Sequence, residues 1–231
     1  MDENNRGCIL GNVVENSIKQ AQLFGGQFYQ ADFAYENRNH QGEKFVIPVF
    51  FPESMKKEME ESQHPDKQVA IYGKLRSYNK DYHLYILFQV DKVSHNIEDG
   101  HRPNIIHLKA TTTRRKGMYI GLKNGQRVMN WVCQVPEYNE NGEVVDMNFI
   151  PVVFFGSVAK KVRDLDESSQ HKINMFGVFI NRIYAVHKNG KKIVKTAFEF
   201  YALQVGKIEN LTKRALENKQ NQEQDNRENN D

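Results

Sequence analysis

The sequence of 231 residues lacks the short motifs of the commonest enzyme chemistries. It has no GxxxxGK[ST] loop for phosphates, no HExxH or CxxC pattern, and no glycine-rich strand–helix–strand unit. Its eight histidines are scattered along the chain, which argues against a metal site. These absences predict a protein with no catalytic residues, no metal and no cofactor.

Long apolar runs and cysteines are also scarce. No apolar stretch approaches the roughly 18 residues of a membrane-spanning helix. The first residues, MDENNRG, do not have the basic-then-apolar pattern of a signal peptide, so we expect a cytoplasmic protein. The cysteines are Cys8 and Cys133, in predicted strands of different halves. We expect both to be free, buried thiols in a reducing compartment.

Two neighbouring stretches indicate the fold. VVFFGSVAKKV (152–162) reads as a buried strand, a glycine and a short helix, with apolar residues Val158, Val162 and Leu165 on one helix face. GVFINRIY (177–184) lies in the following strand, which carries an early glycine. In an otherwise strand-rich chain, this order predicts a five-stranded barrel with one capping helix, the oligonucleotide/oligosaccharide-binding (OB) fold.

The same order of turn, strand, helix and glycine occurs twice. The matched positions are Tyr35 with Tyr138, Pro48 with Pro151, Lys56-Lys57 with Lys160-Lys161, and Gly73 with Gly177. The spacing grows by one residue after the prolines, which predicts a bulge or insertion in the third strand. We therefore predict an all-β chain of two tandem OB-fold barrels made by duplication, each with a short capping helix.

The predicted domains are residues 1–94 and 105–208, joined by a polar linker at 95–104. Residues 209–231 are predicted to be a short helix followed by a disordered, polar and acidic tail. The expected strands are 8–15, 28–36, 44–51, 68–78 and 82–93 in the first half, and 105–112, 127–136, 145–155, 172–184 and 193–205 in the second. Loops are expected at 23–27 and 113–126.

Charge separates the two halves. Residues 1–104 hold 12 Lys and Arg against 15 Asp and Glu, whereas residues 105–219 hold 19 against 10. The basic second half argues for a polyanionic partner, although a solvated basic surface is also consistent with the count. We expect the second domain to contribute most of any nucleic-acid affinity.

The motifs resemble those of the bacterial single-stranded DNA-binding proteins. The resemblance is carried by FIPVVFFGSVAKKV (149–162) and GVFINRIY (177–184) in the second half, and by CILGNVVEN (8–16), FVIPVFF (45–51) and GKLRSYNKDY (73–82) in the first. It covers nearly all of residues 6–208 in two copies. It implies a non-catalytic protein that binds single-stranded DNA in replication, recombination, repair or transfer, through phosphate electrostatics and base stacking on aromatic rings.

The resemblance and the charge pattern together predict a set of nucleic-acid-binding residues. Stacking aromatics and phosphate-binding cations are expected at Phe45, Phe51, Arg76, Tyr78, Tyr82, Tyr138, Phe149, Phe155, Arg182, Tyr184, Lys188, Lys191 and Lys192. The loop cations Arg114, Arg115 and Lys116 are expected to close on phosphates. For Phe51 and Phe155, core packing is an equal alternative. Arg182 and Tyr184 should share a face of their strand, because side chains alternate along a strand.

The sequence departs from the family in ways that leave alternatives open. Phe and Tyr replace tryptophan at the stacking positions, and the tail lacks the apolar tip that recruits replication and repair enzymes in the family. Two barrels in one chain imply that a homodimer would hold four OB folds. A scaffold or accessory protein whose main partner is another protein, and a single-stranded RNA binder, are the alternative functions.

Overall fold

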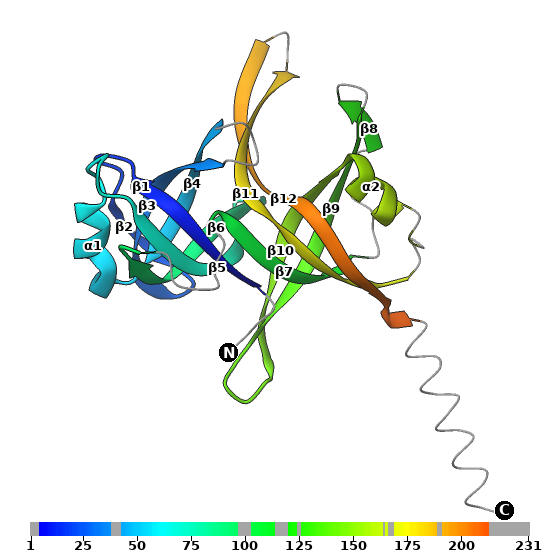
Figure 1. Ribbon diagram of the computed structural model, residues 1–231, viewed down its shortest axis with the longest axis horizontal. Coiled ribbons are helices and arrows are strands. Elements are labelled where there is room, and N and C mark those ends of the chain that lie inside the picture. Colours follow the sequence, from blue (N-terminus) through cyan, green and yellow to red (C-terminus); the bar gives the residue numbers. More distant parts are fainter. Residues whose placement is uncertain are drawn as a thin grey trace, which may run out of the picture.

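A computed structural model describes residues 5–37, 43–96, 103–113, 120–123, 126–163, 165, 169–188 and 191–212. The described chain is mostly β-structure (Figure 1). The first half contains β1 (Asn5–Val13), β2 (Lys19–Leu23), β3 (Gly26–Asn37), β4 (Glu43–Phe51), a 3-10 turn (Glu53–Met55), α1 (Lys56–Glu61), β5 (Val69–Lys80) and β6 (His83–Ser94). The second half contains β7 (Ile105–Thr112), β8 (Ile120–Lys123), β9 (Gln126–Tyr138), β10 (Val144–Phe155), α2 (Gly156–Arg163), β11 (His171–Lys188) and β12 (Lys191–Asn210).

Each half closes into a five-stranded barrel with the same topology. In the first, the hydrogen-bonded order β1-β3-β4-β6-β5 returns from β5 to β1. In the second, β7-β9-β10-β12-β11 returns from β11 to β7. The third and fifth barrel strands pair in parallel in both halves, and the other described pairs are antiparallel. This is the OB-fold, so the predicted fold class is confirmed.

The two barrels are joined by pairing of their first strands. β1 and β7 run antiparallel, with Gly7 opposite Ile106. On their other sides, Gly7 lies opposite Gly73 and Ile106 lies opposite Gly177, so Gly7 and Ile106 occupy equivalent positions. The pairing therefore follows an approximate twofold axis through this residue pair. A Cβ at Gly7 would lie 2.5 Å from Cγ1 of Ile106, so the join needs a glycine here.

The strand register tests the sequence repeat residue by residue. Pro48 and Pro151 precede the valines that make the parallel pairs to the last strand of each barrel, so these prolines are equivalent. Gly73 and Gly177 are also equivalent, because each lies at a register shift against the last strand, beside a carbonyl that a Cβ would contact. The predicted match of Tyr35 with Tyr138 is wrong.

Tyr35 lies opposite Phe45 inside the first barrel, whereas Tyr138 lies opposite Val144 at the end of a longer hairpin. The second-barrel residue in register with Tyr35 is Val135. The extended β9–β10 hairpin places the tyrosine beyond the barrel. A register shift of β10 does exist, but it lies before Pro151, at its N-terminal end near Val144, and not after the proline.

Alternating side chains fill the barrels, and the helices close them. The core includes Phe33, Phe51 and Phe88 in the first barrel and Trp131, Phe154 and Phe200 in the second, all almost completely buried. Met59 of α1 and Val162 of α2 are fully buried against these cores. Gly156 begins α2 at a φ of +52°, a conformation that favours glycine at the strand-to-helix turn.

The expected strands are present, with three differences in extent. The loop expected at 23–27 is a tight hairpin between β2 and β3, and β8 forms a similar hairpin with β9. β11 and β12 continue to Lys188 and from Lys191, well beyond the expected ends. β12 also continues to Asn210, where the sequence suggests a helix. The tail from residue 213 lies outside the described residues, as does most of the expected linker.

Helices in the described part of the chain lack the length and apolar character needed to cross a membrane.

Candidate nucleic-acid interface

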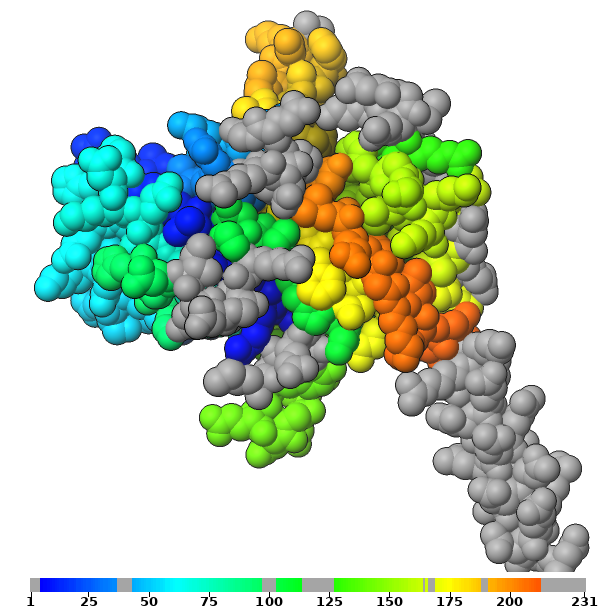
Figure 2. All heavy atoms as spheres, in the orientation of Figure 1, coloured from blue at the N-terminus to red at the C-terminus, as the bar shows by residue number. Residues whose placement is uncertain are grey.

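A two-stranded ribbon formed by the ends of β11 and β12 projects from the second barrel (Figures 1 and 2). The ribbon extends to the pair Lys188–Lys191, while the equivalent β5–β6 hairpin of the first barrel ends at Lys80–His83. From Leu75 and Phe179, which are equivalent in register, the first hairpin runs five residues to its end and the ribbon runs nine. Most of the exposed cations of the ribbon lie in the part that extends beyond the length of the β5–β6 hairpin.

The two faces of the ribbon differ: one carries most of its lysines together with Val186 and Ile193, and the other carries its most exposed apolar residues together with Lys192. We call the side of Arg182, Tyr184, Lys191 and Lys195 the basic face, because Tyr184 lies opposite Lys195 and alternation places the others beside them. Lys188 lies opposite Lys191 in the strand register. Figure 2 shows that the ribbon stands clear of the barrel body on the side in view.

The opposite face, which we call the apolar face, carries Ile183 and Val194, exposed by 68% and 64%. Lys192 lies on this side near the tip, opposite His187. Large apolar side chains are normally more buried than this. The ribbon therefore presents two chemically different surfaces on a thin element.

Arg182 is held within the basic face rather than left free. Its guanidinium donates two hydrogen bonds to the carboxylate of Glu199, at 2.9 and 2.7 Å, and lies 5.1 Å from the centroid of the Tyr184 ring. The hydrogen bonds to Glu199 raise the pKa of Arg182. Arg182 and Tyr184 share a face, as the alternation predicts. Glu199 binds two nitrogens of the guanidinium, so Arg182 also positions the Tyr184 ring, and its phosphate contact stays a prediction.

A second aromatic group lies on the outer side of the sheet at the end of β10. The rings of Phe155 and Tyr201 stack at 4.8 Å with an interplanar angle of 22°, and both residues are half-buried. Burial raises the pKa of the Tyr201 hydroxyl. Phe155 therefore points away from the core, which contains Phe154 instead. Sequence reasoning missed Tyr201, although its position between buried Phe200 and Ala202 is a signal for an outward side chain.

The predicted aromatics of the first barrel do not form an equivalent surface. Phe45 and Phe51 are 6% and 0% exposed and belong to the core, so we remove them from the interface. The outward neighbour, Phe50, is covered by Phe24 at 5.2 Å between ring centroids. Further contacts extend this group into a strip of rings, which we call the aromatic strip: Phe28, Phe50, Phe24, Tyr78 and Tyr85.

Arg76 lies between the barrels instead of on an open surface. It is 9% exposed, and it forms ion pairs with Glu137 at 2.5 Å and with Asp146 at 2.8 Å. The same guanidinium lies 4.3 Å from the centroid of the Phe24 ring. Lys74 adds a further contact to Glu137 at 2.6 Å. The predicted phosphate role of Arg76 is therefore replaced by a structural one, as a clamp from β5 to β9 and β10.

The remaining predicted residues differ in accessibility. Tyr82 is fully exposed at the tip of the β5–β6 hairpin, with a φ of +61°. Tyr78, Tyr138 and Phe149 are half-buried. The backbone N–H of Phe149 donates to Oγ of Ser77, so Phe149 lies at the junction of the barrels. The predicted loop cations Arg114, Arg115 and Lys116 lie outside the described residues.

The chemistry of the described chain gives little support to other kinds of site. Within the described ranges, His, Cys, Asp and Glu side chains do not gather in the threes that could hold a metal ion. Cys8 and Cys133 are both buried and are not joined in a disulfide. Burial raises the pKa of the Cys133 thiol to about 12, which keeps it protonated and poorly nucleophilic at neutral pH.

Comparison with known proteins connects this geometry with solved structures. No protein-family model matches the chain, and no curated protein matches it. The wild-type single-stranded DNA binding protein from Thermus aquaticus superposes with a TM-score of 0.58 and 14% identity, covering 88% of this chain and 92% of that one. A deletion mutant of that protein gives 0.58 and 13%, covering 88% and 93%. The N-terminal domain of PriB from Thermoanaerobacter tencongensis gives 0.32 and 22%, covering 40% and 96%.

The chain has the fold of the Thermus aquaticus proteins. In OB-folds, ligands bind the face of the second and third strands and the loops that follow the first and fourth strands. In the second OB-fold of this chain, these parts are β9, β10 and the β11–β12 ribbon. The basic face and the Phe155–Tyr201 stack therefore belong to elements that form the binding region of OB-folds.

Proposed function

We propose that the protein binds single-stranded DNA without catalysis, and that the second barrel contributes most of the affinity. The observation that carries this proposal is the basic face of the β11–β12 ribbon, where Tyr184 is held by Arg182 among lysines. Non-specific single-strand binders combine cations that follow the phosphates with rings on which bases stack. The fold shared with a bacterial single-stranded DNA-binding protein supports the same function.

In the proposed binding mode, lysines bind the phosphates and aromatic rings stack on the bases. Lys191, Lys192 and Lys195 are exposed and supply counter-charges for phosphates. Tyr184 and the Phe155–Tyr201 pair supply ring surfaces for bases. Residues 114–116 are proposed to add phosphate contacts. The proposed setting is DNA replication, recombination, repair or transfer, with proteins of these processes as further partners and a homodimer of four OB-folds as the assembly.

Equilibrium binding of a fluorescent oligo-dT at several salt concentrations tests the proposal. We expect measurable affinity and a negative slope of log affinity against log salt, of about 0.7 for each phosphate contact on a single strand. Binding of oligo-U with equal or higher affinity would favour RNA as the natural ligand. Absence of binding at low salt contradicts the proposal. Sedimentation equilibrium of the same protein tests the homodimer.

A scaffold that binds another protein is the second candidate, and the apolar face of the ribbon favours it. Ile183 and Val194 are exposed where a solvated ribbon would carry polar residues. Replacing both with serine should leave oligo-dT affinity unchanged if this face serves a protein partner. A large loss of DNA affinity would instead assign the apolar face to the nucleic-acid site.

A further inference from the structure

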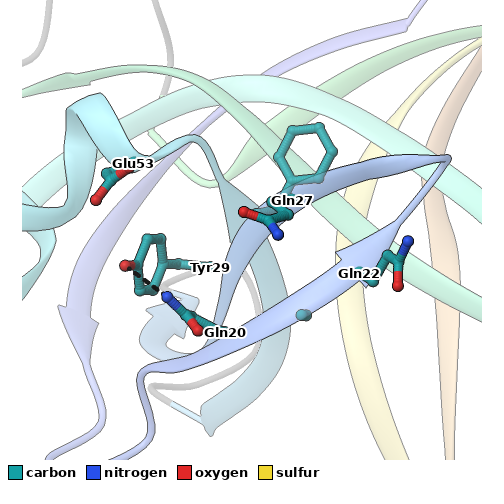
Figure 3. A pocket seen from close by; sticks show the side chains of 7 residues that line it. Gln20, Gln22, Gln27, Tyr29 and Glu53 are labelled. Atoms are coloured by element: carbon teal, nitrogen blue, oxygen red, sulfur yellow. Dashed lines mark hydrogen bonds between the residues drawn. The ribbon is translucent and has the colours of Figure 1, made fainter.

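The outer side of the β2–β3 hairpin in the first barrel holds a cavity that the proposed interface does not use. It has a volume of about 230 Å³ and is lined by Gln20, Ala21, Gln22, Gln27, Phe28, Tyr29 and Glu53. In the hairpin, Gln20 lies opposite Tyr29 and Gln22 lies opposite Gln27. Residues directly opposite on an antiparallel pair project from the same face, so three glutamines and one tyrosine share it. Figure 3 shows these side chains with Glu53 across from Gln20 and Tyr29.

The other face of the hairpin explains why this arrangement is stable. Leu23 and Phe28 pack on Phe50 of the barrel, so the hairpin is anchored by its apolar face. The tight turn at Phe24 and Gly25, both at positive φ, fixes the register of the glutamines. The polar face is therefore carried on a positioned element rather than on a mobile loop.

The Tyr29 ring is fixed and lies beside a cation. It stacks on fully buried Phe51 at 6.1 Å between centroids, and Nζ of Lys56 lies 5.0 Å from its centroid. Its hydroxyl accepts a hydrogen bond from Nε2 of Gln20 at 3.3 Å. One amide is therefore oriented by the ring, and Lys56, which also forms an ion pair with Glu60 at 3.5 Å, places a positive charge next to the cavity.

The two remaining amides are available to a ligand. The side chains of Gln22 and Gln27 make no hydrogen bond to the described part of the chain, so each can still offer an N–H donor and a carbonyl acceptor. A paired donor and acceptor match the edge of a nucleobase, and a glutamine amide makes two hydrogen bonds to N6 and N7 of adenine. A cluster of neutral amides reads base edges, whereas the lysines of the ribbon attract any phosphate.

We propose that this cavity is an adenine-binding site on the first barrel, with Gln22 and Gln27 on the base edge and Lys56 as counter-charge for the nucleotide phosphate. The assignment of a strand-borne adenine rests on the proposed function, whereas the chemistry would be the same for a free adenine nucleotide. The site gives the chain a base preference at one position, in addition to the sequence-independent binding proposed for the second barrel.

The test uses the full chain and compares the wild type with the Gln22→Ala/Gln27→Ala variant. Binding of oligo-dA and oligo-dT is measured by fluorescence anisotropy under the same salt conditions. We expect the variant to lose about 5- to 150-fold in oligo-dA affinity, the range for one bidentate base contact, and to keep its oligo-dT affinity. The matched control is Gln204→Ala, an exposed glutamine on β12, which should change neither affinity.

The possible results test the adenine site independently of the proposed function. If wild type and variant both bind oligo-dA measurably and with equal affinity, the strand-borne adenine site is overturned and the cavity is an ordinary solvated hairpin face. Equal losses for both oligonucleotides also overturn it. If the alanine variant has a lower melting temperature, Gln22→Met/Gln27→Met repeats the measurement, because it keeps the side-chain length and removes the amides.

Adenosine monophosphate alone distinguishes a free nucleotide from a base in a strand. Chemical-shift changes on its addition to the wild type, absent in the variant, support a nucleotide site even if neither oligonucleotide binds and the proposed DNA function fails. An effect on oligo-dA without an effect of the mononucleotide supports a site that acts only on a strand. No effect in either experiment overturns the proposal.

Discussion

At the scale of single residues, the environment of Tyr184 shows how a ring can be kept at a surface without joining the core. Glu199 is almost buried and holds the guanidinium of Arg182, which in turn lies by the Tyr184 ring. The ring needs no apolar pocket because a cation–π contact limits its motion. A fixed ring loses less conformational entropy when a base stacks on it.

Replacing Tyr184 with alanine should weaken oligo-dT binding by about 1–3 kcal/mol, the range for one base stack. The melting temperature should change little, because the ring is only half-buried. Tyr184→Phe should be nearly silent, since it keeps the ring surface. A large loss of thermal stability with unchanged DNA affinity would assign the ring to a structural role.

Burial of the Cys133 thiol predicts that the free energy of unfolding depends on pH. Its pKa is raised from 9.0 to about 12 by burial, so the folded protein keeps a proton that the unfolded chain releases above about pH 9. The free energy of unfolding therefore falls as the pH rises above about 8. Urea unfolding should show a loss on the order of 1 kcal/mol between about pH 8 and pH 10 from this group.

The Cys133→Ala variant is the control for this effect. It should be less stable at every pH because of the lost packing, yet it should lack this part of the pH dependence. Burial also raises the pKa of Tyr35, which is why the comparison is best made no higher than about pH 10. An identical pH dependence in both proteins would contradict the assignment to Cys133.

At the scale of elements, the ribbon and the β5–β6 hairpin show how equivalent hairpins have diverged. The shorter hairpin ends in a turn at Asp81 and Tyr82, both at positive φ, and its rings join the aromatic strip. In the longer ribbon, Arg182 and Ala197 are in register with Tyr78 and Tyr85, and lysines follow nearer the tip. The first barrel's outer face is therefore covered by its own aromatic side chains, whereas the β11–β12 ribbon of the second barrel extends into solvent.

Shortening the ribbon tests its electrostatic role. Replacing residues 185–194 with an Asn-Gly turn joins the opposed residues Tyr184 and Lys195 and removes Lys188, Lys191 and Lys192. The salt slope of oligo-dT binding should become flatter by up to about 2 units, at about 0.7 for each phosphate contact. The control is alanine at Lys160 and Lys161, which removes two exposed cations from α2 instead of three from the ribbon and should leave the slope nearly unchanged.

The elements also show what the sequence could and could not predict. The match of Gly73 with Gly177 is correct because a Cβ at either position would meet a carbonyl oxygen of the last strand, and the strand register shows that the match of Pro48 with Pro151 is also correct. Phe45 and Phe51 were misplaced because FVIPVFF is apolar at every position and contains no alternation to identify its outer face. Arg76 was misplaced because its partners, Glu137 and Asp146, come from the other barrel and are distant in sequence.

At the scale of the whole molecule, the twofold-like join of β1 and β7 makes the two barrels one continuous sheet. The join continues in side-chain contacts: Asn148 of β10, almost fully buried, accepts from the backbone N–H of Ser77 on β5. Together with the Arg76 clamp, these contacts connect two barrels whose outer faces differ. The two barrels therefore pair with approximate twofold symmetry, although their outer faces carry different side chains.

Gly7→Val should destabilise the protein by about 1–3 kcal/mol, as overpacking of a tight contact does, because its Cβ would meet Ile106 of the other barrel. Chemical unfolding followed by circular dichroism measures the loss. The double variant Gly7→Val/Ile106→Ala should recover part of it, since the smaller residue makes room. Full stability of Gly7→Val would mean that the barrels are joined less closely than the register indicates.

The continuity of the chain from β6 to β7 also changes how the barrel pair responds to dilution. Two separate barrels that met through their first strands would form a bimolecular equilibrium, and their fraction paired would fall as the protein became scarce. Here each barrel meets its neighbour at an effective concentration set by the connecting segment, whatever the number of molecules in solution. The ratio of one β11–β12 ribbon to one glutamine-lined hairpin is therefore the same at trace levels as at high abundance.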